Sequence, residues 1–255
     1  MKKKTQQQLR KQKIQELIGV NPDARQYFFY KADERWLDWL WDNGFLDTIK
    51  EKAEDSTRYG YQMPELNYLV RIAGRKPKQV VDIILTVPIS KENFNPEVID
   101  QFSRICSALP AEQLARIVSK IRDDRWGRLM SSFDRWGFEY EKMFEILAVA
   151  KDYKSILILA EAVLSVRTKE EIKETSRGFS SDNPFYFNNL SYTKVFENLI
   201  AIDDENAEQA LELATKVMEK IMLLGDKAES NEVFPVREIF YLSDVDFFSL
   251  GPSDK

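Results

Sequence analysis

Helical periodicity, repeated along the chain in pairs, is the feature that most constrains the fold. Over 95–109 apolar residues recur every three or four positions, and Asn95 followed by Pro96 supplies an N-cap and a proline at the first helical position. Pro110 begins a second amphipathic stretch almost without a loop. We therefore expect the two helices to fold back on each other as a hairpin.

Paired stretches of this kind recur at 64–87, 95–122 and about 138–167, with like helices roughly 30 to 40 residues apart. The pattern predicts an all-α fold: a right-handed α-solenoid of HEAT-like helical hairpins with an irregular aromatic C-terminal segment. The β-branched run Val80–Val87 fits a buried strand equally well by composition. We interpret it as a helix because it lies within a series of helices.

The N-terminal region is rich in large aromatic residues. Asn21-Pro22 is a helix start before Tyr27, Phe28 and Phe29, and Asp33 caps a Trp-rich stretch that Asn43-Gly44 ends. We expect these aromatics to form a dense cap over the first hairpin, because a solenoid needs its end shielded.

Changes in composition divide the chain into five predicted segments. A final amphipathic helix is expected over 204–224, with Leu211 on its apolar stripe. The segments are a basic N-terminal helix or arm at 1–20, the HEAT-like solenoid at 21–172, a linker loop at 173–190, C-terminal helices at 191–225 and an acidic aromatic tail at 226–255.

Composition removes several classes of site. The chain has no histidine, and Cys106 is its single cysteine, which excludes Cys/His zinc sites, Ser-His-Asp and Cys-His nucleophiles and an intramolecular disulfide. Cys106 lies on an apolar helix face and is predicted to be a buried small hydrophobe. Glu171-Ile172-Lys173 has the spacing of a metal nuclease but is better interpreted as a solvated charge run. We assign no catalytic residue, metal ligand or cofactor; a histidine-free carboxylate enzyme using Mg²⁺ or Mn²⁺ stays a further hypothesis.

Charge is distributed unevenly. The net charge is −5, yet residues 1–13 carry six basic side chains and no acidic one. That basic start is a candidate for phosphate contact, although a solvated helix beginning also explains it. No run approaches the roughly 18 apolar residues of a membrane span, and no secretory signal is present. With one cysteine, a cytoplasmic protein is expected.

Three stretches together carry a resemblance: YFFYKADERWLDWLWDNGFL, PELNYLVRIAGRKPKQVVDIILTV and NPEVIDQFSRICSALPAEQLARIVSKI. Over about residues 27–122, the chain resembles the HEAT-like helical segment near the start of large, mostly uncharacterised bacterial proteins. Some of these resemble multidomain NTPase or nuclease effectors encoded in antiviral defence loci. The resemblance implies a recognition or docking module attached to a catalytic part, and this sequence shows no such part.

Partner contact is expected at aromatic clusters. Asp-Arg-Trp-Gly occurs at 124–127 and again at 134–137. The two Arg-Trp pairs are candidates for stacking or partner contact. In the alternative interpretation, each Trp-Gly serves only for packing and as a helix C-cap. Aromatic segments further on dock on another protein or fold back onto the same solenoid. The candidate partner-binding residues are Arg125, Trp126, Arg135, Trp136, Phe185, Tyr186, Phe187, Phe247 and Phe248.

These observations favour a non-enzymatic helical-repeat scaffold or adaptor whose partner is another protein, an effector or regulator, as in the recognition module of a bacterial defence system. The alternative is a nucleic-acid-binding helical protein that uses the basic N-terminus and the Arg-Trp repeats. A membrane partner is not expected.

Overall fold

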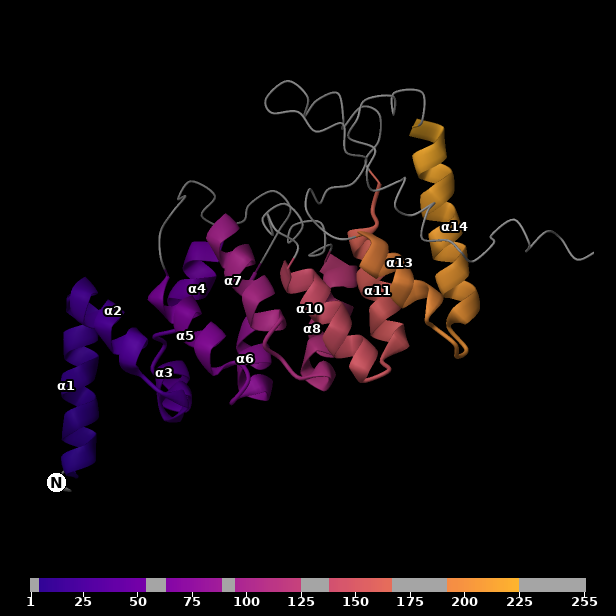
Figure 1. Ribbon diagram of the computed structural model, residues 1–255. Helices are drawn as coiled ribbons and strands as arrows, with labels where there is room; N and C mark the ends of the chain where they lie inside the picture. The colour runs from indigo at the N-terminus through magenta and orange to yellow at the C-terminus, as the bar shows by residue number, and fades with distance from the viewer. Residues whose placement is uncertain (1–4, 54–62, 89–94, 125–137, 167–191, 225–255) are drawn as a thin grey trace, which may run out of the picture. The chain divides into compact units, whose positions relative to one another are not determined.

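All regular secondary structure in the described part of the chain is helical, which confirms the predicted all-α class. A computed structural model describes residues 5–53, 63–88, 95–124, 138–166 and 192–224. The chain divides into two compact units, residues 1–109 and residues 110–255. Figure 1 shows their helices in chain order.

The first unit is built around helix α5, which packs against α2, α6 and α7, while α1 packs against α2. Leu66, Tyr68, Leu69 and Ile72 of α5 are buried because the helix has neighbours on several sides. The elements of this unit are α1 (Gln6–Val20), α2 (Pro22–Lys31), the 3₁₀ helix η1 (Glu34–Trp36), α3 (Leu37–Asp42), α4 (Asp47–Ala53), α5 (Pro64–Ile72), α6 (Pro77–Ile84) and α7 (Pro96–Cys106).

The second unit is built around α11, which packs against α8, α10, α13 and α14. Because α11 is covered on most sides, six of its residues are buried. Helix α10 also contacts α8 and α13, and α13 contacts α14. The elements are α8 (Ala111–Asp124), α10 (Phe138–Val149), α11 (Tyr153–Val163), α13 (Tyr192–Ile200) and α14 (Ala207–Leu224).

Helix starts follow the capping signals of the sequence. Asn21 accepts a hydrogen bond from the Ala24 backbone N–H at 2.9 Å, and Asn95 accepts one from Glu97 at 3.0 Å. In both cases proline occupies the first turn, where a backbone N–H has no partner within the helix, so the N–H that proline lacks costs no hydrogen bond. The helix starts predicted at these two asparagines are therefore confirmed.

Residues 80–84 of the β-branched run are helical, as predicted, and form most of α6, whereas residues 85–87 follow the helix in a turn. Val80, Val81, Ile83 and Ile84 are all buried, which matches the i, i+1, i+3, i+4 spacing of a helix face rather than the alternation of a strand. Burial on that face outweighs the weak strand propensity of valine and isoleucine.

The aromatic region forms a connected cluster in the first unit, as expected. Phe28 and Trp36 pack edge to face with ring centroids 5.2 Å apart, and Phe29 packs against Tyr68 at 5.8 Å. Trp36 continues to Trp39 at 5.4 Å. Helix α2 is thereby joined to η1, α3 and α5 through ring contacts.

Two expectations from the sequence are wrong in detail. The pattern puts Leu211 on the apolar stripe of the last helix, but its side chain is 46% exposed because α14 turns a narrower face toward α11 and α13. The pattern also groups Tyr27 with the packed aromatics of α2, but this residue is 65% exposed. Helix α4 is not predicted at all, because a seven-residue helix is too short for a clear period.

Among the described residues, no helix is both long enough and apolar enough to cross a membrane.

Replacing Asn95 tests the capping of α7. We expect Asn95→Ala to lower the free energy of unfolding by about 1–2 kcal/mol, because the buried N-terminus of α7 loses its side-chain acceptor. Urea unfolding followed by circular dichroism gives the difference. Asn67→Ala, at an exposed position within α5, is the control and should change stability by less than about 0.5 kcal/mol. Equal effects of the two substitutions would contradict the capping role of Asn95.

Candidate functional site

The partner-binding residues predicted from the sequence all lie outside the described residues, so they stay predictions. Arg125, Trp126, Arg135 and Trp136 fall in 125–137, Phe185 to Phe187 in 167–191, and Phe247 and Phe248 in 225–255. The described part of the chain presents a different candidate in the first unit.

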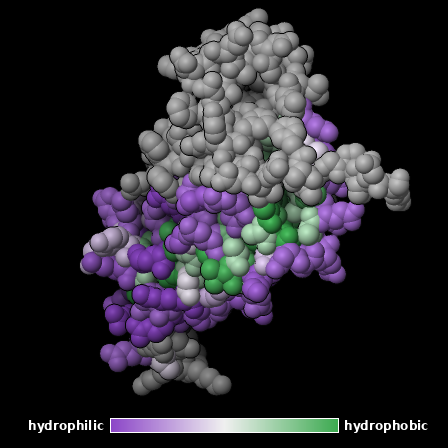
Figure 2. Space-filling view, turned by 45° about the vertical axis from the view of Figure 1, so that its right-hand side comes forward, coloured by the Kyte–Doolittle hydropathy of each residue, from purple (hydrophilic) through white to green (hydrophobic). Residues whose placement is uncertain are grey.

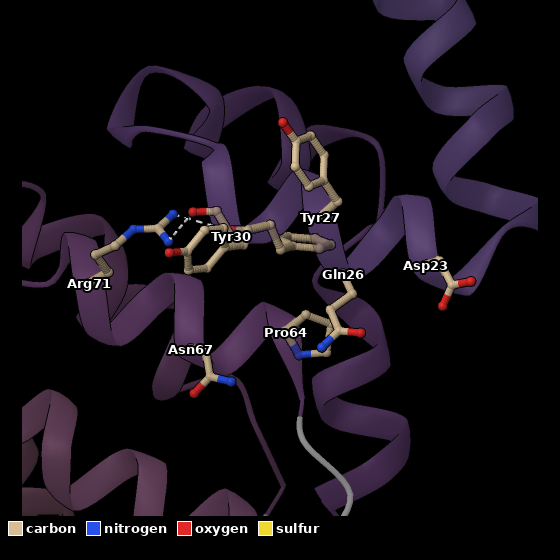
Figure 3. A pocket seen from close by; sticks show the side chains of 8 residues that line it. Asp23, Gln26, Tyr27, Tyr30, Pro64, Asn67 and Arg71 are labelled. Atoms are coloured by element: carbon tan, nitrogen blue, oxygen red, sulfur yellow. Dashed lines mark hydrogen bonds between the residues drawn. The ribbon is translucent and has the colours of Figure 1, made fainter.

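A groove of about 360 Å³ lies between α2 and α5 (Figure 3). The α2 residues are spaced i, i+3, i+4 and i+7, with Phe29 between them, and the α5 residues i, i+3 and i+7, so each helix contributes one continuous face. The lining residues are Asp23, Gln26, Tyr27, Phe29 and Tyr30 from α2, and Pro64, Asn67 and Arg71 from α5.

The two helices run side by side in a constant register. Arg25 bonds to Glu65 and Arg71 bonds to Tyr30, so the sequence offset between α2 and α5 is 40 residues at one contact and 41 at the other. The elements that follow keep the offset of 41, because Arg75 bonds to Glu34 of η1, and Gln79 of α6 bonds to Asp38 of α3.

Arg71 holds the C-terminal end of α2. Its guanidinium donates to the backbone carbonyls of Tyr30 at 2.6 Å and Phe29 at 2.9 Å, and also to that of Ala32. Carbonyls in the last turn of a helix have no partner within the helix and carry its negative dipole end. One cation satisfies three of them, which fastens α5 to α2 at this end of the groove.

A buried ion pair fastens the other end. Arg25 Nε lies 2.5 Å from Glu65 Oε1, and Glu65 is only 2% exposed. The same guanidinium donates to the Phe45 carbonyl and the Thr48 hydroxyl, both at 3.1 Å. The pair joins α2, α5 and the start of α4.

Two tyrosines border the groove and are unusually exposed for aromatic residues so close to a core. Tyr27 is 65% and Tyr30 69% exposed. The Lys31 ammonium lies 4.8 Å from the Tyr30 ring centroid and 6.0 Å from that of Tyr27. The rings and the cation form one amphipathic rim on the C-terminal half of α2.

Side-chain amides occupy the middle of the groove. Gln26 projects from α2 and Asn67 from α5, and both are exposed. Neither amide forms a hydrogen bond with another described residue. Each therefore offers an N–H donor and a carbonyl acceptor to a ligand.

Charged groups lie at opposite ends of the groove. Figure 3 shows Asp23 at one end and Arg71 at the other. Within the described residues, neither Asp23 nor Lys31 forms an ion pair, and Arg71 bonds only to carbonyls. By contrast, Arg25, Arg35 and Arg75 are paired with carboxylates. The groove thus carries an acidic end and a basic end without internal neutralisation.

Several titratable groups elsewhere in the first unit have shifted pKa values because they are hydrogen-bonded or buried within the fold. A side-chain hydrogen bond from Arg35 holds the pKa of Asp33 below its usual value. Burial raises the pKa of the Tyr68 phenol, whose O–H donates to the Asp33 carbonyl at 3.0 Å. Burial also raises the pKa of the Cys106 thiol to about 12. Cys106 is 0% exposed, which confirms the predicted buried small hydrophobe.

No cluster of three or more His, Cys, Asp or Glu side chains suited to a metal ion occurs among the described residues. The groove lacks a nucleophile–base pair, and what it offers chemically is hydrogen bonding, aromatic contact and charge pairing.

Comparison with known proteins gives no relative: no protein-family model, curated protein or solved structure matches the chain.

Sequence reasoning missed the groove, although one signal was present. On α2, Asp23, Gln26, Tyr27 and Tyr30 form a stripe of polar and hydroxyl-bearing residues at helical spacing, next to the buried Phe29. A stripe of that kind marks a surface face, but which helix lies beside it depends on tertiary packing.

Arg71 provides a test of how the groove is held together. We expect Arg71→Met to lower the free energy of unfolding by about 2 kcal/mol, because three carbonyls at the end of α2 lose a charged donor. Arg71→Lys should recover only part of the loss, since an ammonium lacks the planar fork.

The matched control is Arg75→Met, also in the first unit. Arg75 forms an exposed ion pair with Glu34 at 3.1 Å, so its loss should change stability by about 0.5 kcal/mol or less. Urea unfolding of the three variants checks this, and similar losses at Arg71 and Arg75 would contradict the anchoring role of Arg71.

Proposed function

We propose that the chain is a non-enzymatic scaffold of HEAT-like helical hairpins, arranged as an α-solenoid, that binds another protein. The observation that carries the proposal is the register in the first unit, where three successive side-chain ties join residues 41 positions apart. A constant offset of this size is typical of repeats of about 40–47 residues that stack on their neighbours.

Packing within the second unit supports the same proposal. Helix α8 packs on α11 and α10 packs on α13, so each of the described helices of this unit contacts the described helix two places along as well as the adjacent one. Helix α11 begins 42 residues after α8, and in the first unit α5 begins 42 residues after α2. In stacked helical hairpins, each helix packs both on its partner within the hairpin and on the equivalent helix of the adjacent hairpin.

We propose a binding function rather than catalysis because of the types of residue that the chain and its groove contain. The chain contains no histidine, and its single thiol is buried with a raised pKa. The groove, by contrast, presents unpaired amides and charges beside exposed aromatic rings. Such mixed aromatic and polar surfaces are common in protein interfaces. As part of this proposal, the partner is an effector or regulator in the cytoplasm.

Surface hydrophobic residues of the second unit give weaker support. Val149, Ile200 and Leu211 are exposed, and Figure 2 shows hydrophobic residues interrupting a largely hydrophilic surface. They offer apolar contact area but no polar groups that would select a ligand, so the groove of the first unit is the better candidate.

Reconstitution tests the scaffold proposal. Proteins that co-purify with the full chain from its native host are identified, produced separately and mixed with it. We expect at least one to form a defined complex by size-exclusion chromatography with light scattering. Bovine serum albumin at the same concentration is the negative control. Failure of every candidate to bind, or turnover of nucleotides or DNA with Mg²⁺ or Mn²⁺, would contradict a non-enzymatic scaffold.

Nucleic-acid binding is the second candidate, favoured by α1. Arg10 and Lys13 are exposed on this helix, and Lys11 lies 6.0 Å from the Trp39 ring. Neutralising Arg10 and Lys13 to glutamine should remove a salt-dependent gel shift of single- or double-stranded DNA if this candidate is right. The matched control is Lys76 and Lys78 changed to glutamine, and no shift at low salt would eliminate the candidate.

A further inference from the structure

We infer that the α2–α5 groove binds an extended peptide segment of the partner protein, with a basic side chain of the segment beside Asp23 and an acidic side chain beside Lys31 and Arg71. This inference rests on the proposed function and specifies the chemistry of the partner.

The amides in the middle of the groove indicate a peptide backbone. Gln26 and Asn67 face the groove from neighbouring helices, and each has a free donor and a free acceptor among the described residues. A peptide bond presents the complementary pair, one carbonyl acceptor and one N–H donor. An extended segment has no internal hydrogen bonds, so its backbone groups are available for such pairing.

The apolar part of the groove indicates a large side chain between the charged ends. Phe29 forms a buried floor, and Tyr30 and Pro64 line the sides. A volume of about 360 Å³ accommodates one aromatic or branched aliphatic side chain together with its backbone.

The charges give the spacing of the segment. Asp23 and Lys31 are eight residues apart on α2, which corresponds to about 12 Å along a helix. An extended chain covers that distance in about four residues. The preferred segment therefore has a basic and an acidic residue about four positions apart with a large apolar residue between them.

The same charges argue against a nucleic acid at this site. Asp23 is exposed and has no cationic partner in the described residues, so a phosphate backbone laid along the groove would meet an unpaired carboxylate. A peptide with both signs of charge satisfies both ends.

Selection from a random dodecapeptide library displayed on phage tests the inference. We expect peptides selected on the full chain to share the spaced basic, apolar and acidic residues. Synthetic peptides from that set should bind by fluorescence anisotropy, and Lys31→Glu should weaken them by roughly fivefold to tenfold. Replacing the acidic residue of the peptide with lysine should restore binding to Lys31→Glu.

Asp23→Lys should likewise weaken binding of the selected peptides. Peptides in which the basic residue is replaced by glutamate should bind Asp23→Lys again, and this result would support the geometry. Lys78→Glu, an exposed charge reversal on α6, is the matched control and should leave binding unchanged. All three positions are exposed, and circular dichroism verifies that each variant is folded.

Three results would overturn the inference: selection without a shared motif, selected peptides whose binding ignores both charge reversals, or a fluorescent oligothymidine whose binding depends on Lys31 and Arg71 while peptides do not bind. If a reconstituted partner complex still forms when the groove inference fails, the scaffold function stands and only the site is wrong. If no complex forms, the proposed function fails independently.

Discussion

The buried ion pair between Arg25 and Glu65 is the interaction on which the first unit depends. A carboxylate as buried as Glu65 needs a cation and hydrogen-bond donors, because an isolated charge in a protein interior costs several kcal/mol. Arg25 supplies the charge and uses its remaining N–H groups on the Phe45 carbonyl and the Thr48 hydroxyl. Sliding α5 along α2 by one turn would leave Glu65 unpaired. The pair thus selects one register, and the core around it is formed by buried aliphatic residues together with Phe29 and Tyr68.

The register fixed by this pair explains the rest of the surface. Because α5 is parallel to α2 with a constant offset, Arg71 reaches the last carbonyls of α2, and Arg75 and Gln79 meet their partners on the following elements. Arg25 and Arg75 are neutralised by Glu65 and Glu34, whereas Arg71 bonds to carbonyls. Asp23 lies at one end of the groove and Lys31 lies beside Tyr30 near the other, and this separation of charge gives the groove its direction.

Helix starts and buried helix faces can be predicted from the sequence, whereas the groove cannot. Asn95 with Pro96 specifies its helix start through bonds within four residues, and the spacing of Val80, Val81, Ile83 and Ile84 specifies a buried helix face. These signals are local. The groove depends on which face of α5 meets α2, and that choice is made by Arg25 and Glu65, 40 residues apart in the sequence. No periodicity connects them. The exposure of Leu211 escapes prediction for a related reason, since the width of an apolar stripe does not reveal how much of it a neighbour covers.

A double-mutant cycle on Arg25 and Glu65 measures the controlling interaction most directly. The free energies of urea unfolding are compared for the unmodified chain, Arg25→Met, Glu65→Gln and the double variant. A pair that sets the register should give a coupling energy of about 2 kcal/mol or more, with the double variant far less destabilised than the sum of the single ones. Additivity within about 0.5 kcal/mol would show that the two residues act independently, and it would contradict the alignment of α2 and α5 by this ion pair.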